Sequence, residues 1–325
     1  MHHERVMKSF NIDFNWHEGK AAAPGVFAGA DAKKIVDWYA ELGVNNFWTF
    51  MTTYNGYAWY PSKVAPVTPG LESNFMKDTT DLGHKKGLEV FAYVCLGSNP
   101  RLEAEKPEEA RRYKGNYINM DFTDEYLEYF CDVLKEGLRA ADIDGIVIDW
   151  FREPAGKRPF WLDSEKMLYK QLTGEDFPIS GEPGDDEVIE FDRKLLEKAW
   201  KKIKGTVDST RKVKIWTNQP FEKIDDPIWN GHILMNQADY LLNESPNVEL
   251  LSWIRSQAGE HTTVIQDICG WANHDASIWK TIDTGKYGLF GFAPADFETC
   301  LPSLRSSEKS FGNIEAVREA FKFII

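Results

Sequence analysis

The stretch ADIDGIVIDWFREP, residues 141–154, carries the clearest structural signal in the sequence. Its centre, residues 145–148, is a short apolar run rich in β-branched residues, which is typical of a buried strand. The run ends abruptly at Asp149. Because an ionised carboxylate is costly to bury without partners, an aspartate at the tip of such a strand is either paired or used chemically.

Similar apolar runs recur along the whole chain and alternate with amphipathic helical patterns. Apolar runs without internal alternation, separated by helices, indicate a parallel sheet covered by helices. Eight such units in 325 residues predict a (β/α)₈ barrel, and a doubly wound open sheet is the alternative, although no GxGxxG follows the first strand. The predicted strands cover 9–16, 45–51, 88–97, 145–150, 212–218, 238–244, 262–268 and 288–294. The predicted helices cover 31–43, 74–87, 124–142, 188–210, 247–258 and 275–284.

No low-complexity linker divides the chain, so we expect a single catalytic domain over residues 1–325. The longest interruption, residues 151–187, is rich in glycine, proline and acidic residues and contains a short helical pattern near 163–172. Loops of this length in compact domains are often functional. We interpret this segment as an insertion on the barrel after the fourth strand.

Composition restricts the kinds of partner. A net charge of −13 argues against nucleic acid and anionic membranes. The four cysteines have no CxxC spacing, and neither a signal peptide nor a membrane-spanning run is apparent. We therefore expect a cytoplasmic protein with reduced thiols, and homo-oligomerisation stays open.

Side chains at the predicted strand ends suit a carbohydrate ligand. In such barrels the chemistry gathers where the strands end. Carboxylates there can act as nucleophile or general acid/base, amides can bind sugar hydroxyls, and aromatic faces can stack on sugar rings. The predicted substrate-binding residues are Trp16, His17, Tyr54, Tyr57, Trp150, Arg152, Asn218, Asn243, Asp267 and Trp271.

Two carboxylates, Asp149 and Glu244, each end a strongly apolar strand, the fourth and the sixth. Side chains from these strands can face each other across the mouth of a barrel, so we predict that the two form the catalytic pair. Structural roles are the alternative, with Asp149 paired to Arg152 and Glu244 paired to a cation of another loop. Asp267 and Glu153 stay open as alternative proton donors.

The sequence implies no cofactor and no metal. It has no phosphate-binding loop, and its seven histidines show neither HxH nor HExxH spacing. A metal-dependent hydrolase or lyase built on Asp149, Asp267 and His17 is an alternative, and it would lose its activity to a chelator.

Several stretches resemble a known family of barrels. NNFWTFMTTYNGYAWYPSKVAPVTPGL (45–71), DLGHKKGLEVFAYV (81–94) and DGIVIDW (144–150) resemble the hypothetical glycosyl hydrolase family 6, which is distantly similar to the family 29 α-L-fucosidases. The fucosidase nucleophile, an aspartate ending the fourth strand, corresponds to Asp149. The α-galactosidase clan pairs such an aspartate with a carboxylate of the sixth strand, which corresponds to Glu244. An early His-His-Asp-Gly-Phe-like motif of the fucosidases is replaced here by TTYNGYAWY (52–60), which leaves the sugar open.

These observations predict a retaining glycoside hydrolase that acts on short oligosaccharides or glycosides. Asp149 would attack the anomeric carbon, and Glu244 would protonate the leaving oxygen and then activate water. Glu244 should have a raised pKa, because of its apolar strand and the nearby charge of Asp149. The alternative from another class is a barrel that binds carbohydrate without turnover.

Overall fold

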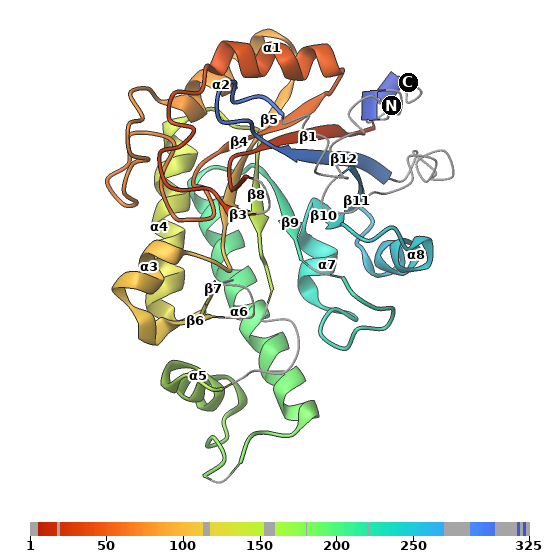
Figure 1. Cartoon of the computed structure of the whole chain (residues 1–325). Helices are drawn as coiled ribbons and strands as arrows, with labels where there is room; N and C mark the ends of the chain where they lie inside the picture. Colours follow the sequence, from red (N-terminus) through yellow and green to blue (C-terminus); the bar gives the residue numbers. More distant parts are fainter. Residues whose placement is uncertain are drawn as a thin grey trace.

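The computed structural model is a closed barrel of eight parallel strands (Figure 1). It describes residues 6–17, 20–112, 118–152, 160–179, 181–219, 221–269, 287–302, 317–318 and 321–322. Each strand pairs with its neighbours along the sequence, and the first pairs with the last. This arrangement confirms the predicted (β/α)₈ barrel. The strands, in order around the ring, are β1 (Lys8–Asp13), β4 (Asn46–Phe50), β5 (Glu89–Cys95), β8 (Gly145–Asp149), β9 (Lys214–Asn218), β10 (Tyr240–Asn243), β11 (Thr263–Cys269) and β12 (Tyr287–Pro294).

Helices on the outside of the barrel connect most of these strands (Figure 1). The first begins after Asp31, whose side chain accepts a hydrogen bond from Lys34 N, and it ends at Gly43 in the left-handed conformation. The predicted helix over 275–284 lies outside the described residues. The longer helices are α1 (Ala32–Leu42), α2 (Phe75–Lys85), α4 (Asp124–Ala140), α6 (Asp185–Thr210) and α8 (Val248–Gln257), and a short α7 (Ile233–Gln237) precedes β10.

The first strand is shorter than predicted and ends at Asp13, not at Trp16. The chain turns there because the Asp13 carboxylate accepts a hydrogen bond from Asn15 N at 2.8 Å. The residues that follow form a small antiparallel hairpin, β2 (Trp16–His17) with β3 (Lys20–Ala21). Asp13 is therefore the residue at the tip of β1.

Aromatic side chains fill the interior of the barrel. The fully buried Trp216 of β9 has its ring centroid 5.1 Å from that of Trp48 and 5.6 Å from that of Phe290. Tyr240 and Phe91 complete this cluster from β10 and β5. The barrel is thus a packed core and not a pore, and its aromatic interior forms a rigid floor for whatever binds above it.

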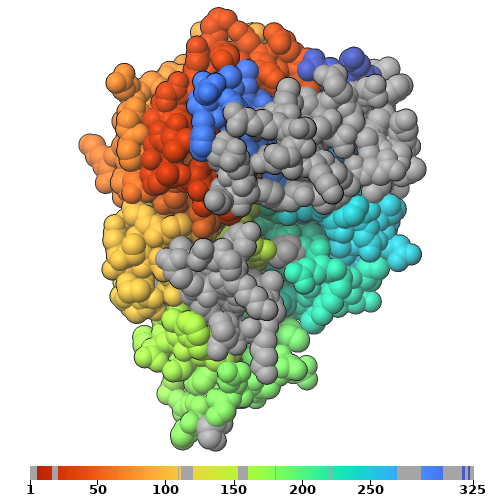
Figure 2. Space-filling model, in the orientation of Figure 1, coloured from red at the N-terminus to blue at the C-terminus, as the bar shows by residue number. Residues whose placement is uncertain are grey.

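The predicted insertion contains α5 (Asp163–Thr173) and the first three residues of α6, which begins three residues earlier than expected. Aromatic rings hold the two helices together: Phe191 of α6 lies 5.7 Å from Trp161 and 5.6 Å from Tyr169. In Figure 2 this green segment projects from one end of the molecule. The assignment of residues 1–325 to one domain stays a prediction.

The segment between β5 and α4 contains short elements that the sequence did not indicate. They are α3 (Pro100–Glu105), a 3₁₀ turn η1 (Pro107–Glu109), and the antiparallel pair β6 (Ala110–Arg112) and β7 (Ile118–Met120). Three-residue strands are too short to produce a recognisable period. Among the described helices, none is long and apolar enough to cross a membrane.

Candidate active site

A cavity of about 260 Å³ opens where the barrel strands end. Seven of the eight strands, or the residues directly after them, contribute to its walls. Its volume is at the small end of the range of about 300–1,000 Å³ typical of ligand sites, which suits a single small ring. The lining residues are Asn11, Asp13, Asn15, Trp16, Trp48, Tyr93, Asp149, Trp150, Arg152, Asn218, Leu242, Glu244, Phe290 and Phe292.

Asp149, at the tip of β8, is held by three hydrogen-bond donors. Its Oδ2 accepts from the Tyr93 hydroxyl at 2.6 Å, and its Oδ1 accepts from Asn218 Nδ2 at 2.6 Å and from Trp150 N at 2.9 Å. Burial raises the pKa of Asp149, whereas these donors and Arg152 oppose the rise. Tyr93 stays protonated and keeps donating, because burial and the charge of Asp149 raise the pKa of its hydroxyl well above the ordinary value. The carboxylate is therefore fixed in one orientation, facing the cavity.

Asn218, at the end of β9, connects Asp149 to Glu244. The same nitrogen that donates to Asp149 lies 3.2 Å from Glu244 Oε1. The two carboxylate oxygens therefore lie within about 6 Å of each other, the upper limit set by the sum of the two distances. Carboxyl groups about 5–5.5 Å apart are typical of retaining glycosidases, and separations of about 6.5–9.5 Å are typical of inverting ones.

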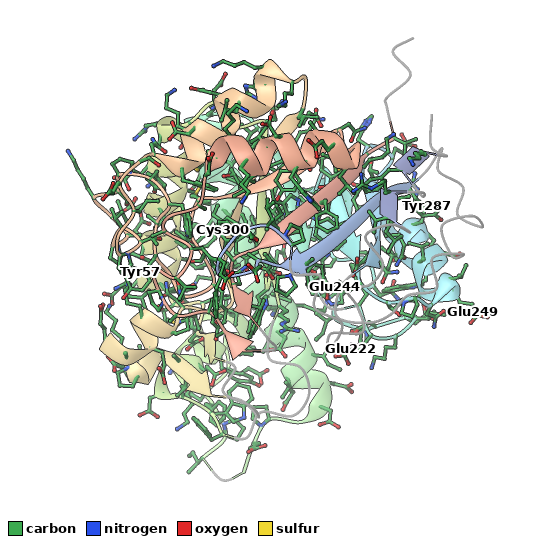
Figure 3. The ribbon with its side chains drawn as sticks, turned by 45° about the horizontal axis from the view of Figure 1, so that its top comes forward. Tyr57, Glu222, Glu244, Glu249, Tyr287 and Cys300 are labelled. Carbon is green, nitrogen blue, oxygen red and sulfur yellow. The ribbon has the colours of Figure 1, made fainter. Side chains whose placement is uncertain are left out.

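Glu244 follows β10 at the mouth of the cavity, where its side chain is exposed, and Figure 3 places it near the middle of the molecule. The surrounding protein removes part of its hydration, and the charges of Asp267 and Asp149 add to this effect, so the pKa of Glu244 rises to about 7. Water still reaches the Glu244 side chain at the mouth of the cavity. A carboxyl group of this kind can hold a proton near neutral pH and give it up.

Aromatic side chains form one wall of the cavity. Trp150 has a left-handed backbone, with φ 53°, and its ring lies 4.5 Å from the guanidinium carbon of Arg152. Tyr54 packs behind the wall, 5.7 Å from Trp150 and 5.3 Å from Trp16. Gly97 leaves room for this backbone, because a Cβ there would lie 2.4 Å from the Trp150 carbonyl oxygen. A rigid wall of this kind can stack on a sugar face.

Asp13 is the main site residue that the sequence did not indicate. Its side chain is only 5% exposed, and it lines the cavity from β1. Burial and the charge of Asp149 raise its pKa to about 7, although the bond from Asn15 opposes the rise. The signal was present in SFNID, an apolar strand ending in an aspartate, but the strand was expected to run on to Trp16. Tyr93 and Trp48 were missed as well, because they lie within strands and not at their ends.

The cavity brings together six of the predicted residues: Asp149, Glu244, Trp16, Trp150, Arg152 and Asn218. Among the other predicted residues whose side chains the structure describes, none lines it. Asn243 is buried and bonds to Gln266 at 2.7 Å and to the Ser245 carbonyl at 2.9 Å, which shapes the turn after β10. Asp267 is also buried, and its charge acts on Glu244. Tyr54 supports the aromatic wall.

Tyr57 lies on the loop after β4, well away from Glu244 in Figure 3. The side chain of His17, and all of Glu153 and Trp271, lie outside the described residues. The alternative that assigns a metal to Asp149, Asp267 and His17 therefore stays a hypothesis. Within the described part of the chain, no three His, Cys, Asp or Glu side chains cluster in a way that could hold a metal ion.

Comparison with protein families gives a match to residues 31–150, with the model described as hypothetical glycosyl hydrolase 6. This confirms the resemblance drawn from the sequence. A search of curated proteins finds no match. The barrel and the matched segment together support a glycosidase-type function.

Solved glycosidase structures share the fold at low sequence identity. The α-L-fucosidase isoenzyme 2 from Paenibacillus thiaminolyticus is 15% identical, with a TM-score of 0.71 over 98% of this chain and 49% of that one. An α-L-fucosidase of family 29 from Bacteroides thetaiotaomicron is 12% identical, with a TM-score of 0.50 over 99% of this chain and 71% of its own. An α-amylase from H. orenii is 10% identical, with a TM-score of 0.54 over 98% and 82%. The chain spans about half the length of the Paenibacillus protein, and at these identities the likeness concerns the fold alone.

Proposed function

We propose that the protein is a retaining glycoside hydrolase in which Asp149 is the nucleophile and Glu244 the general acid/base. The observation that carries this proposal is the shared donor, Asn218 Nδ2, which brings an oxygen of each carboxylate within about 6 Å of the other. This upper limit is compatible with the separation of about 5–5.5 Å that is typical of retaining enzymes.

The reaction has two displacement steps. In the first, an oxygen of Asp149 forms a bond to the anomeric carbon while the glycosidic bond breaks, and the departing oxygen takes the proton of Glu244. In the second, the Glu244 carboxylate removes a proton from water, and the water oxygen displaces Asp149 from the anomeric carbon. Asp149 returns as a carboxylate and Glu244 as a carboxylic acid, so both groups are ready for another cycle.

The surroundings of the two carboxylates favour this division of roles. Three donors stabilise Asp149 as an anion, which a nucleophile needs to be. Glu244 accepts one longer bond from a described residue, and it sits at the mouth of the cavity, where a leaving group departs toward solvent. Its raised pKa suits proton donation near pH 7. Asp13 lies deeper in the cavity and does not face the mouth in this way.

The shape of the cavity supports a short substrate with one sugar ring inside it. The aromatic wall of Trp150 and Trp16 offers a flat apolar face, and Arg152 offers hydrogen-bond donors. α-L-Fucosides are the first substrates to test, because the Paenibacillus and Bacteroides proteins are described as α-L-fucosidases. α-D-Galactosides and α-D-glucosides come next.

The decisive experiment follows hydrolysis of 4-nitrophenyl α- and β-glycosides of these sugars and records the anomer first formed by proton NMR. Retention of configuration is expected. A 2-deoxy-2-fluoro glycosyl fluoride of the accepted sugar should label the peptide that contains Asp149, as detected by mass spectrometry. Inverted product, or a label on another residue, would contradict the assignment. Sugar binding without any hydrolysis would instead support the carbohydrate-binding alternative.

A further inference from the structure

Asp13 is a buried carboxylate whose hydrogen-bond donors all come from one nearby residue. Oδ1 accepts a hydrogen bond from Asn15 N at 2.8 Å, and the Asn15 side chain also donates to the carboxylate. No positively charged side chain among the described residues forms a salt bridge with it. The side chain is 95% buried and borders the cavity. Since a carboxylate is costly to bury without a balancing charge or further donors, this group suits a ligand that can donate to it.

The barrel topology gives Asp13 a position that the other two carboxylates do not occupy. Around the ring, β1 stands three strands from β8, which carries Asp149, and three strands from β10, which precedes Glu244. The last two strands are separated only by β9. The three carboxylates therefore surround the cavity from three sides. If Asp149 and Glu244 flank the bond to be broken, Asp13 meets the sugar ring from the third side.

The inner face of β1 carries further polar groups below Asp13. Side chains alternate along a strand, so Ser9, Asn11 and Asp13 point to one side. Ser9 Oγ donates to Asn46 Oδ1 at 2.6 Å. By contrast, Asn11 Oδ1 and Trp48 Nε1 are buried at the cavity wall without a hydrogen-bond partner among the described residues. The floor beside Asp13 thus offers one donor and one acceptor that the protein leaves unpaired.

We propose that Asp13 is the specificity-determining residue of the site, and that its carboxylate accepts a hydrogen bond from a ring hydroxyl remote from the anomeric carbon. This inference rests on the proposed glycosidase function and names the part of the substrate that the enzyme reads. Asp13 takes part in no bond making or breaking. The Asp13 carboxylate would also accept a hydrogen bond from the ammonium group of an amino sugar, so the test includes amino-substituted glycosides.

The test compares the wild type with Asp13→Ala on the best 4-nitrophenyl glycoside, its monodeoxy analogues and its amino-substituted analogues. In the wild type, removal of one particular hydroxyl should lower kcat/KM by about 10- to 100-fold, as expected for a hydrogen bond to a charged group. Asp13→Ala should lower kcat/KM for the parent glycoside by the same factor. For this variant, kcat/KM should be no lower with that deoxy analogue than with the parent glycoside. A larger wild-type preference for an amino-substituted glycoside, abolished in the variant, would identify an amino sugar as the substrate.

Two further variants separate recognition from folding. Asp13→Asn keeps an acceptor for Asn15 N but removes the charge, so its loss should be intermediate. Ser9→Ala is the matched control, because Ser9 lies on the same face of the same strand, outside the cavity lining, and it should leave the preference among analogues unchanged. Circular dichroism and a melting curve establish that each variant folds.

The inference is overturned if Asp13→Ala lowers kcat/KM equally for the parent and for every analogue. It is also overturned if kcat/KM of the wild type is the same for the parent glycoside and for each of its monodeoxy analogues. Calorimetric titration of Asp149→Asn with L-fucose, D-galactose, D-glucose and their deoxy forms reports on recognition without turnover. If the wild type hydrolyses none of the glycosides but sugar binding depends on Asp13, the glycosidase proposal fails and this inference stands. Neither binding nor hydrolysis of any of these sugars would overturn both.

Discussion

Asp149 and Glu244 accept hydrogen bonds from one and the same atom, Nδ2 of Asn218, at 2.6 and 3.2 Å. One amide at the end of β9 thereby sets the distance between carboxylates that follow β8 and β10. The two carboxylates differ in their hydrogen bonds, because Asp149 accepts the shorter bond from Asn218 and has two further donors. This asymmetry is the reason why we propose that Asp149 attacks and that Glu244 transfers the proton.

Asp149→Asn should abolish glycoside hydrolysis while the protein stays folded. An amide is a far weaker nucleophile than a carboxylate, so kcat/KM should fall at least about a thousandfold. The substitution removes a half-buried acid without changing its size, and the melting temperature should not drop. Steady-state kinetics together with a melting curve checks both expectations. Full activity in the variant would remove Asp149 from the mechanism.

Glu244→Gln should affect substrates according to their leaving groups. Glycosides with poor leaving groups need the proton and should lose about 10²–10⁴ in rate, whereas the first step with activated aryl glycosides should change little. In the wild type the acid form of Glu244 is required, so activity should fall as the pH rises above about 7. The variant should lack this alkaline limb in its pH–rate profile. Retention of the limb would point to Asp13 or Asp267 as the proton donor.

Asn218→Ala should shift the acid limb of the pH–rate profile. Asn218 holds the pKa of Asp149 down by donating to its anion, so removing the amide should raise that pKa. The acid limb of kcat/KM should therefore move to higher pH, and the maximum should fall by about 10- to 100-fold. Asn230→Ala, at an exposed position on the loop after β9, is the matched control and should leave the profile unchanged.

Asp13→Asn should stabilise the fold at alkaline pH. The pKa of Asp13 is raised to about 7 in the folded protein, above the unfolded value of about 3.9. The folded state therefore binds the extra proton, and the wild type loses stability as the pH rises from about 4 to about 7. The variant avoids this loss, so its melting temperature should exceed that of the wild type at pH 8 and match it near pH 4.5. The free-energy gain at pH 8 is at most a few kcal/mol.

A control for this experiment is Asp163→Asn. Asp163 is exposed and paired with Lys166, which lowers its pKa. Its replacement should give no gain at pH 8. A gain for Asp13→Asn that is equal at both pH values would show that the buried charge is not its cause.

Gly97→Ala should disturb the nucleophile from outside the cavity. A Cβ at this position would lie 2.4 Å from the Trp150 carbonyl oxygen, and the backbone N–H of Trp150 donates to Asp149. The backbone must shift, at a cost of about 1–3 kcal/mol of folding free energy, and kcat should fall. Gly29→Ala is the matched control, since nothing lies within 4 Å of a Cβ there. Equal kcat values for the two variants would contradict the link between Gly97 and Asp149.

The barrel and part of the candidate site can be predicted from the sequence alone. Eight apolar runs and the helices between them predict a parallel sheet, because parallel strands need helical crossovers that cover the sheet. The number of these units favours a closed barrel over a doubly wound open sheet. Asp149, Glu244 and Asn218 were found because each stands where an apolar run stops, which is a local feature of the chain. The barrel rule then brings strand ends together whatever lies between them in sequence.

The sequence does not reveal which of the polar residues near strand ends face the cavity, because this depends on the folded barrel. Asn243 and Glu244 are neighbours in sequence, yet one turns into a buried network with Gln266 and the other reaches the cavity. Asp13 lies at the tip of β1 because its carboxylate accepts a hydrogen bond from Asn15 N, where the strand ends. Tyr93 lies in the site because the register of β5 with β8 places its hydroxyl within hydrogen-bond distance of Asp149. Orientation within a barrel depends on where each strand ends and on its register with its neighbours. Both result from packing among segments distant in sequence, which local patterns do not record.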